Sequence, residues 1–396
     1  MTQDRKPVFK NNQWLYITAA VMAAAVAAIC FFNIRNPIDY QMYEHGATYY
    51  DRGVVADVTK ESLEKVPGTA GRYLGKQEIV VTLKNGLFKG ETVVIQHGLS
   101  TTHNIRVRKG QSLIIRVEAP EGVKPVFSVY NYDRRPGIVA VMLLFFAVTA
   151  AVGGFKGIRS IVGLLFTLFA VLAFLLPMIY AGYSPVLCSI ITVVATSSIS
   201  LILLNGPDKK TLCAVVSSIA GVAMTGVLFL AVSAVLHLSG YNLEETEELL
   251  VISSNTGLKV GEVLFAGMLI SSLGAMMDMA LSLSSSLDEL KRIDSALDRR
   301  RLFSSGMNIG KDMIGTMSNT LILAFMGTAI VTLLVLVSYG VAFNQLMSSD
   351  YIAVEIAQGL SGATGVALTV PFTAAIYAAL AGPPRKRGRS APARRR

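Results

Sequence analysis

The chain has 396 residues, of which 52% are hydrophobic and 16% charged, and its formal net charge is +10. The charged share lies below the roughly 25% typical of soluble domains, and several apolar runs reach membrane-spanning length. These features exclude an ordinary soluble enzyme, and the position of most Lys and Arg beside apolar runs argues against nucleic-acid binding as the main role.

The N-terminus predicts a short tail followed by a membrane anchor. Residues 1–13 form the tail, and the apolar run at 14–33 is the first predicted transmembrane helix. The run is longer than the usual core of a signal peptide, and Phe31-Phe32-Asn33 is a poor cleavage site. We therefore predict a retained anchor rather than a cleaved signal peptide.

A change of composition after the anchor predicts a separate domain over 34–135. Five short runs rich in Val and Ile, separated by Gly, Asn, Lys and Pro, predict strands. They lie at 52–58, 78–83, 91–96, 112–117 and 125–130. Five strands in about 100 residues predict a small barrel or sandwich, for which an OB-like form is one solution. Lys, Arg and Tyr leave nucleic-acid binding open here, but a solvated extracytoplasmic β-domain is favoured because the first span carries it across.

Seven further apolar runs have about the 20 residues needed to cross a bilayer. They lie at about 137–155, 160–180, 184–204, 211–237, 261–283, 315–342 and 357–381. With the anchor, they predict a mainly α, polytopic helical bundle of about eight spans, in which 136–382 is the membrane domain. With the N-terminus in the cytoplasm, most Lys and Arg fall in inner segments and the short outer loops hold only Lys259. We therefore expect a multi-pass protein of the cell membrane with both termini cytoplasmic.

Three segments outside the spans carry further patterns. The outer loop 238–260 contains four Glu with interspersed Leu and Ile, which predicts a short surface helix with a solvated acidic face. The inner segment 287–302 has Leu and Ile on one helical face, which predicts an amphipathic helix that lies on the cytoplasmic membrane surface or packs against its neighbours. The tail 383–396 is basic, its stretch 383–389 lacks apolar content, and it is predicted to be disordered.

Asp278 is the strongest functional candidate because it is a carboxylate within a spanning run. Gly267, Ser271, Gly274, Asp278 and Ser282 recur at helical spacing and form one small, polar face. A charged side chain at membrane depth is costly, and such residues usually face protein or water. We therefore expect Asp278 to look inward at polar neighbours.

Two later spans have polar stripes that are predicted to meet the first one. The candidates for ion coupling or for lining a path are Asp278, Ser271, Ser282, Thr316, Asn319, Thr320, Glu355, Thr369 and Thr373. The alternative is helix packing, because small residues let spanning helices approach closely and hydroxyl groups bond between them. Packing is favoured for Ser271, Gly274, Gly362 and Gly365, and function for Asp278.

Motifs of enzyme chemistry are missing. The sequence has no phosphate-binding P-loop and no His-Glu-x-x-His, and the run at 359–363 ends in Ala where a nucleophile elbow needs Gly. A metal site formed by His45, His97 and His103 is a weak alternative. We expect no enzyme activity, no cofactor and no metal.

Four motifs carry a resemblance to a known family. They are GGFKGIRS at 153–160, LGAMMDMA at 273–280, GKDMIGTMSNTLILA at 310–324 and LTVPFT at 368–373. In this order and over most of 137–381, the chain resembles a YibE/F-like membrane protein, and GTMSNTL is the most specific piece. The resemblance implies a multi-pass, permease-like protein without a settled substrate. The layout is more weakly similar to SecD/SecF and RND-type transporters, from which the chain departs by its one smaller outer domain and one secure intramembrane Asp.

These patterns lead to two hypotheses. The first is a proton- or cation-coupled secondary transporter of unknown substrate, with the lipid bilayer and a small solute or ion as partners. The alternative is an accessory or assembly membrane protein whose extracytoplasmic β-domain binds a protein partner. An intramembrane hydrolase is a distant third, since no nucleophile–base pair is evident.

Overall fold

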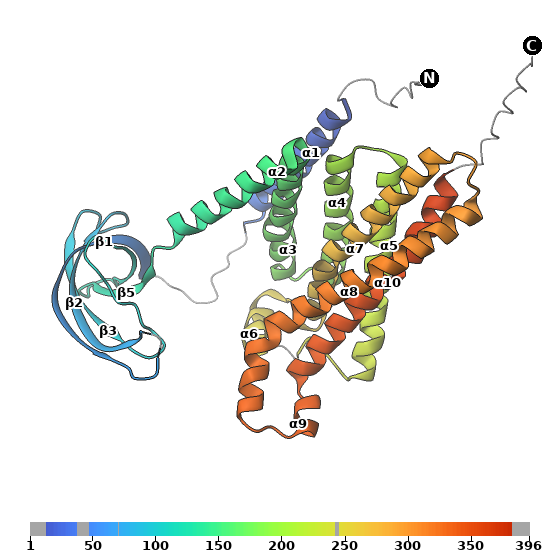
Figure 1. Ribbon diagram of the computed structural model, residues 1–396. Coiled ribbons are helices and arrows are strands. Elements are labelled where there is room, and N and C mark those ends of the chain that lie inside the picture. Colours follow the sequence, from blue (N-terminus) through green and yellow to red (C-terminus); the bar gives the residue numbers. More distant parts are fainter. Residues whose placement is uncertain (1–12, 38–46, 70, 242–244, 382–396) are drawn as a thin grey trace, which may run out of the picture. The chain divides into compact units, whose positions relative to one another are not determined.

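The computed structural model describes residues 13–37, 47–69, 71–241 and 245–381. The chain divides into two compact units, one formed by Tyr40–Val148 and the other by Met1–Asp39 together with Thr149–Arg396. The first unit holds the strands and the second holds most of the helices (Figure 1). The expected terminal tails lie outside the described residues, apart from Gln13.

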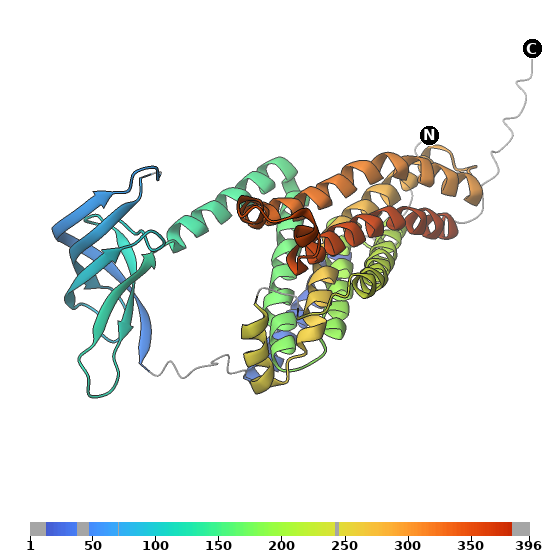
Figure 2. The same cartoon turned by 90° about the horizontal axis from the view of Figure 1, so that it is seen from below.

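Five strands form one antiparallel sheet in the first unit, which we call the β unit. They are β1 (Thr48–Lys65), β2 (Tyr73–Leu83), β3 (Thr92–Leu99), β4 (Ser112–Glu118) and β5 (Val126–Tyr132). Their order across the sheet is β3-β2-β1-β4-β5 (Figure 2). The predicted small all-β domain is confirmed, and its five-stranded, partly open sheet has the form expected of an OB-like domain.

β1 organises this sheet because it pairs with both β2 and β4. Its register against β2 shifts between Val55 and Asp57 and again between Val58 and Lys60, and such bulges bend and twist a strand. The curved sheet closes around alternate inward-facing side chains. This core includes Val55, Ile79, Val81, Leu83, Ile95, Leu113 and Ile115.

His97 is a buried part of the β unit. Its Nε2 lies 2.7 Å from the carbonyl oxygen of Ile105, and burial lowers its pKa. The ring of His103 lies 5.7 Å away, whereas His45 lies outside the described residues. The described ranges hold no group of three or more residues able to bind a metal ion.

The remaining elements are helical. They are α1 (Gln13–Arg35), α2 (Arg135–Ala170), the π-helical turn η1 (Val171–Leu175), α3 (Leu176–Tyr180), α4 (Pro185–Asn205), α5 (Lys209–Val235), α6 (Thr246–Thr256), α7 (Val260–Ile293), α8 (Arg299–Ser338), α9 (Phe343–Met347) and α10 (Asp350–Leu380). Seven helices in the described part of the chain are long and apolar enough to cross a bilayer. The predicted mainly α membrane class is therefore confirmed, and α6 lies in the loop where a short outer helix was expected.

The difference between seven helices and about eight predicted spans lies in Arg135–Tyr180. This stretch has 46 residues. A continuous helix of that length would measure about 69 Å, more than twice the thickness of the hydrocarbon layer. Gly154 breaks it with φ 54° and ψ −137°, a backbone conformation that strongly favours glycine. The stretch therefore contains two of the predicted spans, joined at Gly154 rather than by a loop.

The segment 287–302, predicted as one amphipathic helix, is divided between two helices. α7 continues to Ile293, a short non-helical turn follows, and Asp298 caps the start of α8 by accepting a hydrogen bond of 2.8 Å from a backbone N–H. Leu287 and Leu302 are fully buried between helices. The apolar stripe therefore packs against neighbouring helices, which is the second of the two placements predicted for it.

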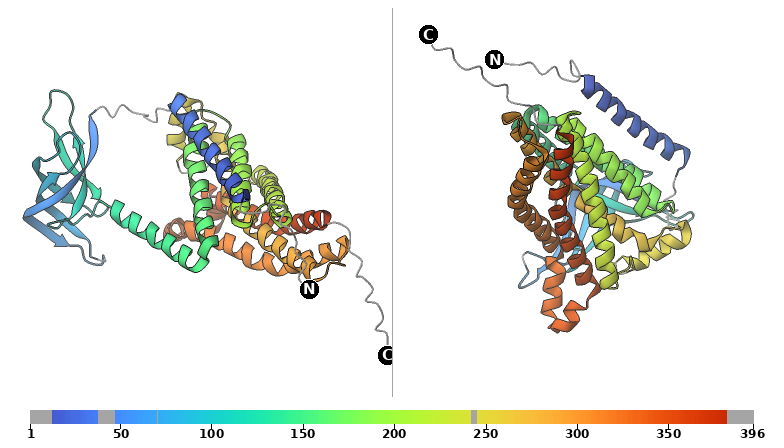
Figure 3. Two further views of the ribbon diagram at one scale, coloured as in Figure 1. Left: turned by 90° about the horizontal axis from the view of Figure 1, so that it is seen from above. Right: turned by 90° about the vertical axis from the view of Figure 1, so that its right-hand side faces the viewer.

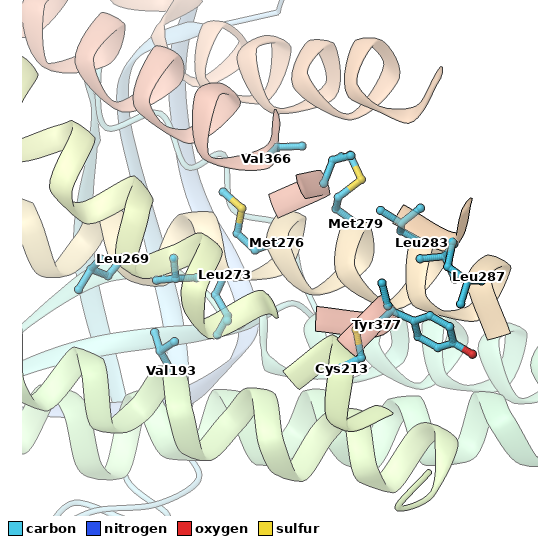
Figure 4. Close-up of a cluster of buried hydrophobic side chains, with 14 residues drawn as sticks. Val193, Cys213, Leu269, Leu273, Met276, Met279, Leu283, Leu287, Val366 and Tyr377 are labelled. Atoms are coloured by element: carbon cyan, nitrogen blue, oxygen red, sulfur yellow. The ribbon is translucent and has the colours of Figure 1, made fainter. Parts of the chain in front are cut away.

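α7 and α10 occupy the centre of the bundle. α7 contacts α4, α5, α8 and α10, and α8 runs along α10 (Figure 3). Leu273, Met276, Met279 and Leu283 follow one another along the buried side of α7, and Tyr377 of α10 lies beside them (Figure 4). The inward face of α7 is therefore mainly apolar, with Ser272 and Ser284 as its buried polar residues.

Candidate functional site in the membrane helices

The polar face of α7 points away from the bundle core. Gly267, Ser271, Gly274, Asp278 and Ser282 are all exposed on the isolated chain. An added Cβ at either glycine of this face would meet no atom within 4 Å. The expectation that Asp278 looks inward is therefore wrong, and among the described residues no neighbouring helix packs against Gly274.

α8 presents a second exposed polar face. Thr316, Asn319 and Thr320 are exposed, as is Asp312 one turn earlier. The two threonine hydroxyls donate to carbonyls of their own helix at 3.0 and 2.9 Å, so no neighbouring helix holds them. We refer to this face and that of α7, defined by Ser271, Asp278 and Ser282, as the two outer polar faces.

Contacts with α10 fix the depth of these faces relative to each other. Met276 of α7 lies 3.1 Å from the hydroxyl oxygen of Thr369, and Gly310 of α8 packs against the next residue, Val370. Gly362, two turns earlier on α10, lies against the side-chain ends of Met268 of α7 and Leu321 of α8, at Cε and Cδ2. Thr316, Asn319 and Thr320 therefore lie between these two levels, at the same depth as Ser271 and Gly274. Asp278 lies just beyond the Met276 level.

The polar stripe of α10 behaves differently because its inner half is buried. Thr369 and Thr373 are completely buried, and their hydroxyls donate to carbonyls one turn earlier in α10 at 2.9 and 2.8 Å. Gly365 packs against the hydroxyl of Thr225, and Gly221 against that of Thr369. This is a close helix contact of small residues, so the three predicted stripes do not meet in one path.

Glu355 lies apart from both arrangements. It is half-buried in an apolar groove of about 380 Å³ between α8 and α10, beside Phe325, Met326, Ile352 and Leu360. One of its carboxylate oxygens, Oε2, is buried without a hydrogen-bond partner in the structure. A carboxylate in such surroundings is able to exchange a proton or hold a cation, but it stands on a different side of α8 from Thr316 and Thr320, by helical periodicity.

A family model described as YibE/F-like protein matches residues 141–383. The chain belongs to the YibE/F-like family. No curated protein and no solved structure matches it. The match runs from within α2 to the residues after α10, so the two outer polar faces and Glu355 lie in the family region. The strands of the β unit lie outside it.

The YibE/F-like chain also buries hydroxyl groups that sequence reasoning missed. They lie on α4 and α5 and are Ser189, Thr192, Thr196, Ser197, Ser200, Thr211, Ser217, Ser218 and Thr225. Thr192, Thr196 and Ser200 recur at steps of four, which is the same signal that revealed the later stripes. The hydroxyl oxygens of Ser200 and Thr211 have no partner within the structure, whereas most of the others donate to carbonyls of their own helix. These residues make the bundle core polar without placing a charge in it.

Proposed function

We propose that this membrane protein is a permease-like secondary transporter coupled to protons or cations through Asp278. Its path runs along the two outer polar faces, on α7 and α8. The observation that carries the proposal is that a carboxylate and five hydroxyl or amide side chains stand exposed on adjacent spanning helices. They are Asp278 with Ser271, Ser282, Thr316, Asn319 and Thr320.

In a bilayer, the two outer polar faces meet either acyl chains or polar groups. Acyl chains offer no hydrogen bonds, and placing a carboxylate against them costs free energy on every scale of membrane insertion. Water or other polar groups must therefore lie against Asp278. A water-filled lateral path between α7 and α8 meets this need and brings a protonatable group to a route across the membrane.

The remaining predicted residues take different places in this proposal. Thr369 and Thr373 hold α10 against α5 and α7 and do not line the path. Glu355 lines the groove between α8 and α10. It lies toward the outer half of the membrane when both termini are cytoplasmic. With that orientation, Asp278 lies in the inner half of the membrane, where a proton exchanges with the cytoplasm.

Reconstituted protein tests the proposal. We expect proteoliposomes with an internal pH-sensitive dye to show a protein-dependent pH change when an outward gradient of Na⁺, K⁺ or a mixture of amino acids is imposed. Protein-free vesicles and vesicles with a proton ionophore set the two limits. If none of these gradients moves protons beyond the protein-free rate, coupled transport of these solute classes is excluded.

A second function, that of an accessory or assembly protein, is favoured by one observation. α8 is apolar enough to span a bilayer, yet only 6% of its most apolar stretch is buried, so another membrane protein has room to dock along it. Isolation of the full chain from mild detergent separates the two functions. A stoichiometric membrane partner together with the absence of any solute-driven pH change supports assembly, whereas flux by the purified chain supports transport.

A further inference from the structure

Two adjoining depressions in the β unit collect arginine side chains. Their volumes are about 430 and 360 Å³, and both are lined by Gly71, Asn104 and Tyr132. Arg106 and Arg108 line the first, and Arg72 and Arg134 line the second. Neither lining contains an Asp or a Glu, so the combined surface is concave, polar and positively charged.

The walls of these depressions are held by hydrogen bonds that leave the guanidinium groups available. The side-chain amide of Asn104 donates to the carbonyl of Ser100 at 2.7 Å and accepts from the backbone N–H of Tyr73 at 3.2 Å. The hydroxyl of Tyr132 donates to the carbonyl of Arg106 at 3.0 Å. These bonds tie the β3–β4 connection to β2 and β5. The depression is therefore a preformed feature of the sheet, as small-molecule sites usually are.

Two of the arginines are positioned by neighbours. The guanidinium of Arg106 lies 4.6 Å from the ring centroid of Tyr73 and 2.8 Å from a carboxylate oxygen of Glu61. Arg72 donates to the carbonyl of Thr101. A guanidinium that stacks on an aromatic ring and is held on one side keeps its remaining N–H groups in a fixed direction.

The other two arginines, Arg108 and Arg134, have no carboxylate partner among residues 47–69 and 71–148 of the β unit. Asp133, beside Arg134, is already paired with Arg135 at 2.8 Å and Arg52 at 3.1 Å, and the hydrogen bond from Arg135 lowers its pKa. Asp133 therefore does not neutralise Arg134, and two guanidinium charges remain uncompensated at the depression.

We propose that this depression is a binding site for a phosphate group. The guanidinium fork matches the spacing of two oxygens on a phosphate, and several forks around one concavity suit a tetrahedral anion with more than two acceptor oxygens better than a single carboxylate. The volume admits a small phosphate compound or the headgroup of a phospholipid. The site is independent of the transport proposal, because no residue of it belongs to the spanning helices.

Titration of the full chain in zwitterionic nanodiscs with inorganic pyrophosphate, at constant ionic strength, tests the site. We expect saturable binding by calorimetry, and at least a tenfold loss of affinity in the double variant R108Q/R134Q. The matched control is R116Q, which removes an arginine of β4 that is paired with Glu118 at 2.6 Å and lines neither depression. The control is expected to bind within twofold of the unaltered chain.

The proposal is overturned if the unaltered chain shows no saturable binding, or if the double variant binds as tightly as R116Q. Unchanged hydrogen exchange of β2 and β4 in the double variant shows that the sheet is intact, so loss of binding then reports on the two arginines. Nanodiscs with phosphatidic acid distinguish the two sources of phosphate. Weaker pyrophosphate binding in these discs supports the site and assigns it to a lipid headgroup, and equal binding supports the site and assigns it to a soluble phosphate compound.

Discussion

Replacing Asp278 by Asn is expected to reduce solute-driven proton flux by about 100-fold or more, the scale on which loss of a positioned proton-transferring group acts. The amide is close in size to the carboxylate but does not accept and release a proton near neutral pH. The variant is expected to be as stable as the unaltered chain. Asp278 is exposed, and its carboxylate makes no hydrogen bond or ion pair within the described residues. The pH-sensitive dye assay and a thermal unfolding curve in the same detergent measure the two quantities.

Glu289→Gln is the matched control for this variant. Glu289 lies on α7 about three turns further along the same exposed face, where its carboxylate pairs with Arg292 at 3.0 Å. Its substitution is expected to leave flux unchanged, since an exposed ion pair of this kind contributes little. Undiminished coupled flux in the Asp278→Asn protein, at equal reconstituted amounts, would remove the coupling role from Asp278.

The Gly365→Val variant has the largest expected effect on stability. A Cβ at Gly365 would overlap the hydroxyl of Thr225 and approach the terminal carbon of Met276 to 2.9 Å. Both neighbours are fully buried, so α10 has to move away from α5 and α7. We expect a loss of at least about 3 kcal/mol, the upper end of the cost of overpacking a core, and a marked fall in the yield of monodisperse protein.

Gly327→Val provides the comparison on α8. An added Cβ at Gly327 meets no atom within 4 Å, so the extra bulk has open space around it. Its unfolding midpoint is expected to stay near that of the unaltered chain. Equal midpoints for the two variants would contradict the close approach of α10 to α5.

The sequence predicted the elements well because local patterns specify them. Short runs of Val and Ile between turn residues identified all five strands, and runs of about 20 apolar residues identified the spans. The break inside Arg135–Tyr180 was harder, since Gly153 and Gly154 lie in an apolar run with no polar loop. A glycine pair signals the possibility of a kink, but only the backbone angles show that the helix stops there.

The sequence did not predict which side of each helix faces inward. In a soluble protein, apolar faces turn inward and polar faces turn out. In a bilayer this contrast disappears, because lipid tails are as apolar as Leu, and small hydroxyl residues are used for packing. The stripe of Thr369 and the stripe of Asp278 have similar spacing, yet the first is buried and the second exposed. Spacing alone therefore defines a face but not its partner.

The buried stripe of α10 has a signal that helps to explain this difference. Gly365 and Thr369 of α10 face small residues on α5, Thr225 and Gly221, and the two pairs leave room for each other. On the face with Asp278, Gly267 and Gly274 meet no such complement among the residues that the structure describes. A search for complementary small residues between spans would have separated packing from the outer polar faces.

The surroundings of Asp278 decide whether α7 and α8 line a path. A spin label attached at Ser282→Cys, in a background without Cys30, Cys188 and Cys213, measures them through collisions with a water-soluble nickel complex and with oxygen, which concentrates in lipid. A label at Leu187→Cys, on an exposed apolar position of α4, gives the lipid reference. In proteoliposomes we expect the label at residue 282 to collide more with nickel than the reference does. Collision rates equal to those of the lipid reference would show that this face meets acyl chains, and would contradict a hydrated path along Asp278.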